Sequence, residues 1–237
     1  MRKIVLFILA FFFSNAASAQ AFSPEAKSFL KKSILPSALV TAGLVIRSNS
    51  HSMGDIAIKR ARDRTFPNFH TKADDYLQFA PLAAMLSLRL SGLKAKHDWK
   101  NGVWIAIKSE LVMIALVETL KRTTQVRRPD SNARNSFPSG HTAQAFAAAA
   151  ILHHEFGQRS VWYSVGGYAC AATIGAMRIL NNRHWASDVL AGAGIGILAV
   201  EFVYASHQGT LLKSNTLIIP SYSPFSGGQI YLVHRFK

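Results

Sequence analysis

The segment RILNNRHWASDVLAGAGIGI, residues 178–197, places charged and aromatic side chains directly before a run of small and apolar ones. Residues four positions apart lie on the same face of an α-helix, so His184 and Asp188 are predicted to be neighbours at the start of a helix over residues 185–206. The repeated glycines in this run suit close packing between helices in a membrane. The segment therefore predicts a tightly packed helix that begins at a polar site, with Arg178 nearby.

Five further apolar stretches are predicted to be helical. They cover residues 34–46, 74–93, 101–121, 142–153 and 161–180. The first is shorter than the roughly 20 residues that span a bilayer, so it is expected to lie at the membrane interface or to pack on the other helices. Residues 215–237, NTLIIPSYSPFSGGQIYLVHRFK, have β-rich runs on both sides of a Pro-Phe-Ser-Gly-Gly turn, which predicts a small β-hairpin. The predicted fold class is all-α, a membrane-embedded bundle of five or six helices with this C-terminal hairpin.

The composition indicates a membrane-associated protein with an anionic partner. The 237 residues are 49% hydrophobic and 16% charged, against about 25% charged in soluble domains. The 27 lysines and arginines exceed the 12 acidic residues and give a net charge of +15, which favours nucleic acid, an anionic membrane surface or a phosphorylated substrate. No nucleic-acid-binding module is recognisable, so the last two are expected as partners. The single cysteine, Cys170, excludes an intrachain disulfide.

The N-terminus, MRKIVLFILAFFFSNAASAQ, has the pattern of a secretory signal peptide. Two basic residues precede an apolar run over residues 4–13, and cleavage is expected after Ala19, at the end of Ala-Ser-Ala. An uncleaved membrane anchor is the alternative. The predicted organisation is a signal peptide (1–19), a short helix with a basic polar segment (20–73), the helical bundle (74–206) and a tail with the hairpin (207–237).

A second polar motif opens the Ala-rich helix predicted at residues 142–153. In RNSFPSGHTAQAF, residues 134–146, Ser139 can cap the helix, and the free backbone N–H groups of its first turn can bind an anion. Gly140 allows the backbone to approach a ligand closely, and His141 lies beside this site.

Basic residues form a third motif upstream. Lys121 is followed after six residues by Arg128 and Pro129, with Arg127 and Arg134 close by in sequence. Ammonium and bidentate guanidinium donors suit a phosphate dianion. Taken singly, the three motifs would be a basic loop, a helix cap and a surface His–Asp pair. Their order and spacing together favour a function.

In combination the three motifs resemble the type 2 phosphatidic acid phosphatase and vanadium haloperoxidase superfamily. Its signature is Lys-x6-Arg-Pro, then Pro-Ser-Gly-His, then Ser-Arg-x5-His-x3-Asp. Every position is matched except one, because Met177 stands where a serine usually precedes the arginine. The methionine removes one possible hydroxyl hydrogen bond, and all the charged residues of the signature are kept. The motifs span residues 121–188, and the resemblance covers about residues 74–206.

The resemblance implies catalytic roles for three residues. His184 would attack phosphorus to form a phosphohistidine, and Asp188 would hydrogen-bond the other nitrogen of that ring. His141 would protonate the leaving oxygen and later activate water. Phosphate oxygens would be bound by Lys121, Arg128, Ser139, Gly140 and Arg178. No metal and no cofactor is expected, since positioning and charge stabilisation suffice for this chemistry; Asp74 and Asp75 are interpreted as helix caps.

Within the superfamily the chain most resembles bacterial lipid A phosphatases of the Bacteroidetes type, on the stretches DDYLQFAP, SFPSGHTA and MRILNNRHWASDVLAGAGIGI. This implies hydrolysis of a phosphomonoester on a lipid headgroup, with lipid A favoured. Undecaprenyl pyrophosphate, phosphatidylglycerol phosphate and phosphatidate are alternative substrates, and a vanadate-dependent haloperoxidase or a non-catalytic lipid-phosphate binder are alternative functions.

Two further expectations concern the headgroup and the location. Arg127, Arg134 and the basic segment at 47–72 supply more positive charge than one phosphate needs, which favours a polyanionic lipid. The signal peptide and the family resemblance together imply a bacterial inner membrane, with the active site facing the periplasm.

Overall fold

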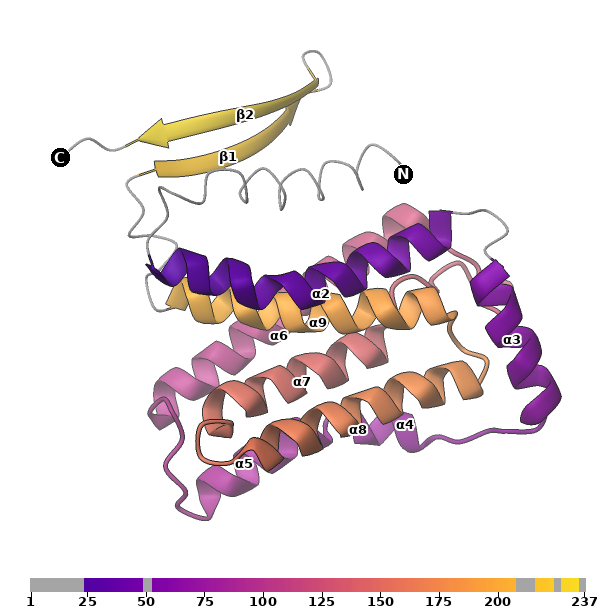
Figure 1. The fold of residues 1–237 in the computed structure, drawn as a ribbon, viewed down its shortest axis with the longest axis horizontal. Coiled ribbons are helices and arrows are strands. Elements are labelled where there is room, and N and C mark those ends of the chain that lie inside the picture. Colours follow the sequence, from indigo (N-terminus) through magenta and orange to yellow (C-terminus); the bar gives the residue numbers. More distant parts are fainter. Residues whose placement is uncertain (1–23, 49–52, 208–215, 224–226, 235–237) are drawn as a thin grey trace. The chain divides into compact units, whose positions relative to one another are not determined.

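The structure is a computed structural model that describes residues 24–48, 53–207, 216–223 and 227–234. It divides into two compact units, residues 33–203 and the two ends of the chain, 1–32 with 204–237. The predicted signal peptide lies outside the described residues. All three sequence motifs belong to the first unit, in which long helices lie side by side (Figure 1).

Eight helices are present in the described residues, and the all-helical character of the bundle is confirmed. They are α2 (Pro24–Ser48), α3 (Met53–Thr65), α4 (Ala73–Leu77), α5 (Ala80–Leu90), α6 (Trp99–Thr124), α7 (Gly140–Phe156), α8 (Val161–Leu180) and α9 (Ala186–His207). The expected count of five or six is not confirmed. The stretch predicted at 74–93 divides into α4 and α5, because Pro81 stands in the first turn of α5, where proline suits a helix start. The basic polar segment contains the additional helix α3.

The expectation of a short, non-spanning segment at 34–46 is wrong in its length. These residues lie inside the 25-residue helix α2. By length and apolar composition alone, Lys27–Arg47 and Ala186–His207 could each cross a membrane. The segment does pack on the bundle, since a Cβ added at Gly43 would lie 2.6 Å from the carbonyl oxygen of Ser187 in α9. A side chain at this glycine would force α2 and α9 apart.

Helix α7 is buried along most of its length and packs against α5, α6 and α8. Small side chains make this possible, because a run of alanines leaves room for close neighbours. Those with no exposed surface are Ala143, Ala145, Ala147, Ala148, Ala149 and Ala150. Helix α9 approaches the same helix at Gly196, where a Cβ would collide with the carbonyl oxygen of Ala143. Tight packing of this kind holds the start of α7 and the start of α9 in a fixed relation.

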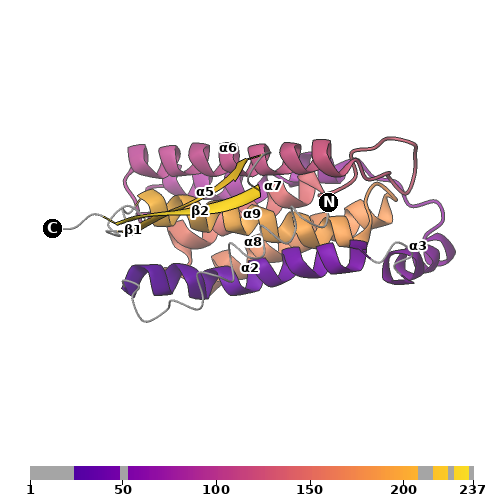
Figure 2. The same ribbon diagram turned by 90° about the horizontal axis from the view of Figure 1, so that it is seen from above.

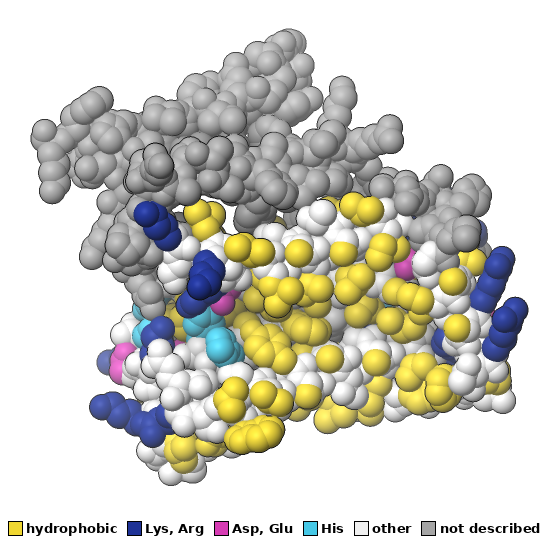
Figure 3. All heavy atoms as spheres, in the orientation of Figure 1, with side chains coloured by type: hydrophobic (Ala, Val, Ile, Leu, Met, Phe, Trp, Pro, Cys, Tyr) yellow, Lys and Arg dark blue, Asp and Glu magenta, His cyan; other side chains and the backbone are white. Residues whose placement is uncertain are grey.

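The outer faces of α6 and α8 carry large exposed apolar side chains. Trp104 and Leu111 project from α6, and Trp162 and Val165 from α8. Figure 3 shows apolar side chains across the visible face of the bundle, with lysine, arginine and histidine gathered toward its ends. An apolar surface of this extent marks a face that meets a membrane or another protein.

Helix α3 lies across one end of the bundle in both views (Figures 1 and 2). Its Arg62 donates from Nε to the carbonyl oxygen of Leu180 at the end of α8 (2.8 Å). Its buried Asp55 accepts hydrogen bonds from the backbone N–H and the hydroxyl of Ser187, at 2.9 and 2.6 Å, in the first turn of α9. The carboxylate thereby caps α9, so α3 fixes the two helix ends between which His184 lies.

In the other unit the structure pairs two strands, β1 (Thr216–Ser223) and β2 (Gly227–His234). They run antiparallel, with Thr216 opposite His234 and Ser223 opposite Gly227. The strands lie in the stretch where the sequence predicts a hairpin.

Candidate active site

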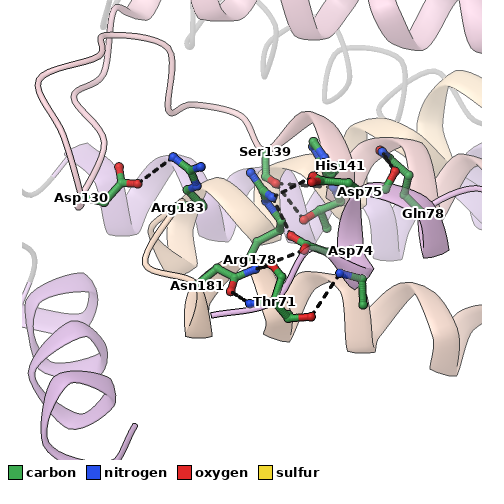
Figure 4. Close-up of polar contacts among 12 residues, drawn as sticks. Thr71, Asp74, Asp75, Gln78, Asp130, Ser139, His141, Arg178, Asn181 and Arg183 are labelled. Atoms are coloured by element: carbon green, nitrogen blue, oxygen red, sulfur yellow. Dashed lines mark hydrogen bonds and ion pairs between the residues drawn. The ribbon is translucent and has the colours of Figure 1, made fainter. Parts of the chain in front are cut away.

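The residues predicted from the sequence lie on helix ends that meet at the α3 end of the bundle. They come from the last turn of α6 (Lys121), the following loop (Arg128), the start of α7 (Ser139, Gly140, His141), the last turn of α8 (Arg178) and the entry to α9 (His184, Asp188). Figure 4 shows Ser139, His141 and Arg178 converging with Asp74 and Asp75 of α4. The site is therefore assembled from segments up to about a hundred residues apart.

His184 is buried, and a backbone carbonyl fixes its tautomer. Its side chain is 2% exposed, and its Nδ1 lies 2.8 Å from the carbonyl oxygen of Ser136. A carbonyl oxygen can only accept, so in the neutral ring Nδ1 carries the proton and Nε2 keeps its lone pair. Within the described residues Nε2 has no hydrogen-bond partner. The ring therefore offers a nucleophilic nitrogen.

Asp188 lies beside His184 but beyond hydrogen-bonding distance of it. Its Oδ2 is 3.5 Å from Nδ1 of the histidine, longer than an ordinary N–H···O bond of about 2.7–3.2 Å. The same oxygen accepts from the hydroxyl of Ser136 (2.5 Å) and the backbone N–H of Trp185 (2.9 Å). The Asp188 carbonyl accepts from the N–H of Ser139 (3.0 Å). Asp188 thus ties the loop before α7 to the start of α9 and positions the carbonyl that holds the histidine.

The electrostatic surroundings keep His184 neutral. Burial lowers the pKa of His184 to about 4, and the charges of Arg128 and Arg178 act in the same direction, while Asp188 opposes them. At neutral pH the ring is therefore the unprotonated form that a nucleophile requires.

The Pro-Ser-Gly-His motif forms the first turn of α7. The hydroxyl of Ser139 caps the helix by accepting from the N–H of Thr142 and also bonds the Thr142 hydroxyl at 2.8 Å. A Cβ at Gly140 would lie 3.3 Å from Nζ of Lys121, so the absence of a side chain leaves the lysine room beside the helix start. The free N–H groups of this turn and the ammonium group together suit an anion.

Arg178 is buried and held by carboxylates of α4. Its Nη1 donates to Oδ2 of Asp74 at 2.5 Å and lies 3.8 Å from Oδ1 of Asp75. Asp74 is 1% exposed and also accepts from Nδ2 of Asn181 (3.1 Å). The Nε of Arg178 is buried with no hydrogen-bond partner in the described part of the chain. One side of the guanidinium is thus fixed, and a donor remains for a ligand oxygen.

His141 is paired with the second carboxylate of α4. Its Nε2 lies 2.9 Å from Oδ1 of Asp75. Burial and the nearby charge of Arg178 lower the pKa of His141, and the hydrogen bond and charge of Asp75 counteract them. The sequence interpretation of Asp74 and Asp75 as mere helix caps missed these contacts. The only available signal was the stretch DDYLQFAP, in which both carboxylates occur.

Arg128 and Lys121 complete the positively charged side of the site. Arg128 is half-buried and donates from Nε to Oδ1 of Asn135 at 2.8 Å. Burial lowers the pKa of the Arg128 guanidinium, and the nearby charge of Arg178 adds to this. Lys121 lies 3.3 Å from a carboxylate oxygen of Glu118. The charges of Arg128 and Arg178 repel one another, and a bound dianion would stabilise both.

The arrangement can bind a tetrahedral oxyanion next to a neutral histidine nitrogen, with a second histidine held by a carboxylate. No group of three or more His, Cys, Asp or Glu side chains in the described residues is placed to hold a metal ion. The chemistry that these residues can perform is nucleophilic attack with proton transfer and charge stabilisation.

Parts of the chain are similar to known proteins. Residues 115–211 match the family model of the PAP2 superfamily. A Porphyromonas gingivalis protein named lipid A 1-phosphatase is 46% identical over 151 residues, which are 63% of this chain and 34% of that protein. This chain therefore spans about a third of the length of that relative.

Two crystal structures are also similar. LpxE of Aquifex aeolicus is 23% identical with a TM-score of 0.47, over 61% of this chain and 93% of that one. The first transmembrane PAP2-type phosphatidylglycerolphosphate phosphatase from Bacillus subtilis is 19% identical with a TM-score of 0.45, over 73% of this chain and 96% of that one.

Proposed function

We propose that this chain is a membrane phosphatase that hydrolyses a phosphomonoester on a lipid headgroup, with the match of residues 115–211 to the PAP2 superfamily model as support. The observation that carries the proposal is the state of His184. Its ring is buried and neutral, and its Nδ1–H donates to the Ser136 carbonyl, beside the two guanidinium groups of Arg128 and Arg178. A neutral nitrogen nucleophile among cations suits a phosphate dianion.

The cations would bind the transferred phosphoryl group. The orphaned Nε of Arg178 would donate to one oxygen, and Arg128 and Lys121 would neutralise the charge on the others. The backbone N–H groups at Gly140 and the start of α7 would add further donors, while the Ser139 hydroxyl is shared with the helix cap. Fixed donors of this kind stabilise the charge that spreads over the equatorial oxygens in phosphoryl transfer.

The reaction would proceed in two displacements. In the first, the Nε2 lone pair of His184 forms a bond to phosphorus, the bond from phosphorus to the lipid oxygen breaks, and His141 gives its proton to that oxygen. In the second, His141 takes a proton from water, whose oxygen displaces His184 and releases inorganic phosphate. Because Asp75 engages Nε2 of His141, Nδ1 is the atom left to exchange the proton. Asp75 stabilises the charged form of the ring and acts as a positioning residue.

We propose lipid A as the favoured substrate. The support is the 46% identity to a protein named lipid A 1-phosphatase, over a segment that makes up 63% of this chain. The basic residues around the site also suit a headgroup with several anionic groups. Undecaprenyl pyrophosphate, phosphatidylglycerol phosphate and phosphatidate are the substrates against which lipid A is to be compared.

We further propose that the bundle lies in the bacterial inner membrane with its active site in the periplasm. Helix α2 is long enough to cross, and its N-terminal turns carry Lys27, Lys31 and Lys32. Positively charged ends of spanning helices are retained in the cytoplasm, so α2 would run outward and deliver α3 to the periplasm. A cleaved signal peptide would instead place the start of α2 in the periplasm, and an α2 that crosses beside α9 would then carry the active site to the cytoplasm.

Thiol labelling of intact cells tests this orientation. With Cys170 replaced by Ala, a membrane-impermeant reagent should label Arg64→Cys in α3 and leave Ser91→Cys, in the α5–α6 loop, unlabelled until the cells are broken. The reverse labelling pattern would place the active site in the cytoplasm.

Purified protein in lipid nanodiscs tests the activity. Phosphate release should be fastest from lipid A among the four lipids, and His184→Ala and His141→Ala should each abolish it. His70→Ala removes an exposed histidine and serves as the control that keeps full activity. Faster phosphate release from undecaprenyl pyrophosphate would make that lipid the preferred substrate in place of lipid A. Phosphate release that survives loss of both His141 and His184 would refute the histidine mechanism.

A further inference from the structure

A cavity of about 260 Å³ opens beside the catalytic cations. It is lined by Glu118, Lys121, Arg122, Gln125, Arg134 and Asn135, and we call it the α6 cavity. Its volume is slightly below the roughly 300–1,000 Å³ of pockets for drug-sized ligands. It therefore suits one compact polar group rather than an acyl chain.

Two of the side chains that line the cavity are guanidinium groups without a partner in the described part of the chain. Arg122 and Arg134 are exposed, and in the described residues neither side chain makes a hydrogen bond or ion pair. The other arginines of this region are engaged: Arg127 donates to Asn132, and Arg183 pairs with Asp130 at 3.1 Å. Free guanidinium groups that face a common cavity are available for an anion.

The charge of the α6 cavity is positive although it contains one carboxylate. Three cations line it against Glu118, and that carboxylate is 3.3 Å from Nζ of Lys121. The remaining positive charge lies on Arg122 and Arg134. Carboxylate and amide groups at the wall, from Glu118, Gln125 and Asn135, can in addition exchange hydrogen bonds with sugar hydroxyls.

The cavity borders the catalytic site through two residues. Lys121 lines it and also lies beside Gly140, whose added Cβ would be 3.3 Å from Nζ. Asn135 lines it and accepts the 2.8 Å hydrogen bond from Nε of Arg128. A headgroup whose phosphate is bound by Lys121 and Arg128 could therefore place a neighbouring group in the cavity.

We propose that the α6 cavity is a subsite for a second anionic group of the substrate headgroup, which is bound there but not cleaved. The inference rests on the proposed phosphatase function and makes it more specific: the preferred substrate is a phosphorylated sugar lipid with at least two anionic groups. Arg122 and Arg134 bind the second group, and a lipid with a single phosphate leaves them unused.

Contacts to the uncleaved group are the same before and in the transition state. They lower KM without raising kcat. Because both arginines are exposed, each is expected to contribute at most a few-fold, as surface ion pairs do, and the pair about 5- to 20-fold. The contribution should also decrease with salt.

The test compares lipid A with two phosphates against the same lipid with one, in nanodiscs of the full chain. The double variant Arg122→Gln/Arg134→Gln should raise KM for the bisphosphorylated lipid about 5- to 20-fold, and leave kcat and the KM of the monophosphorylated lipid within about twofold. Arg127→Gln is the matched control, since it removes an equal charge from the same loop. The sequence grouped Arg127 with Arg134 as headgroup-binding charge, but the Arg127 side chain bonds Asn132 and does not line the α6 cavity. This control should change neither KM.

Two results would overturn the subsite. KM could rise equally for both lipids in the double variant, which would mean a general field effect. Arg127→Gln could reproduce the loss, which would mean that any positive charge in this loop suffices.

Equilibrium binding to the His184→Ala variant separates the subsite from the activity. Tighter binding of the bisphosphorylated lipid that depends on Arg122 and Arg134 supports the subsite even if the parent chain releases no phosphate. That combination would refute the phosphatase alone. Equal binding of both lipids would refute the subsite alone.

Discussion

Replacement of Asp74 by alanine should damage both the stability of the bundle and its catalysis. The carboxylate is 1% exposed and receives a 2.5 Å hydrogen bond from Arg178, whose side chain is 7% exposed. Asp74→Ala leaves this guanidinium buried without its counter-ion. Breaking a buried ion pair from one side costs about 3–5 kcal/mol. For a domain of this size, about 2–4 °C of Tm corresponds to each kcal/mol, so Tm should fall by roughly 6–20 °C.

The catalytic effect follows from the freedom that Arg178 gains. If the guanidinium no longer points its Nε at the phosphate, one charge-assisted hydrogen bond is lost, which is about 1.5–3 kcal/mol. This corresponds to a roughly 10- to 150-fold lower kcat/KM. Asp74→Asn keeps one oxygen that can accept from Arg178, but its NH2 group then faces the Nδ2 donor of Asn181, so it should lie between the parent and the alanine variant in both quantities.

Thermal unfolding in detergent and phosphate release in nanodiscs measure the two effects. Asp75→Ala is the matched control, because this adjacent carboxylate is 51% exposed and its pairs should contribute about 1 kcal/mol or less. Its Tm should stay within about 4 °C of the parent. If Asp74→Ala unfolded at the same temperature as Asp75→Ala and kept parental kcat/KM, the argument that Asp74 holds Arg178 in place would be refuted.

Three further predictions concern single residues. Asp75→Asn should move the alkaline limb of the kcat–pH profile to lower pH, because the Asp75 carboxylate raises the pKa of His141; an unmoved limb would exclude the pairing from catalysis. Ser136→Ala removes the 2.5 Å hydrogen bond to Asp188 and should lower kcat about tenfold or more, with little change in KM. Glu155→Gln weakens a buried ion pair with α5 about 21 Å along α7 from the site, so it should lower Tm and leave kcat unchanged.

Much of the candidate site could be predicted from the sequence because its side chains belong to short, fixed spacings. The three motifs converge as expected, since each lies at a helix end and tightly packed helices hold those ends together. Asp74 could not be assigned in this way. It is 104 residues from Arg178, and nothing local to α4 indicates which cation its carboxylate will meet.

The partner of His184 shows a different limit. The sequence pairs its ring with Asp188, four residues away, but the acceptor at hydrogen-bonding distance is the carbonyl of Ser136. Every residue has a carbonyl, so a backbone acceptor leaves no trace in a motif. The sequence also does not show where a side chain points. Arg127 and Arg134 belong to the same basic loop, yet Arg127 bonds Asn132 within that loop and Arg134 lines the α6 cavity.

The fold shows where local rules give way to packing. The length of the apolar run at 34–46 predicted a short helix, but the run lies within the longer helix α2, whose Gly43 allows the close approach to α9. A single helix was expected over residues 74–93, and Pro81 instead starts a second one, α5. The apolar pattern thus predicted which stretches are helical. It did not predict where each helix begins and ends, because those positions depend on packing against other helices.

The central claim is that Nε2 of His184 attacks the phosphate. The most direct test is to quench the enzyme in alkali within milliseconds of mixing with its lipid substrate, since phosphohistidine survives alkali, and to locate the phosphate by peptide mass spectrometry. Phosphate is expected on His184 alone in the parent and on no residue in His184→Ala. With a substrate whose leaving group needs no proton, phosphohistidine should accumulate in His141→Ala, because the water that releases the phosphate is no longer activated. Rapid phosphate release with no phosphorylated His184 at any time would contradict the central claim.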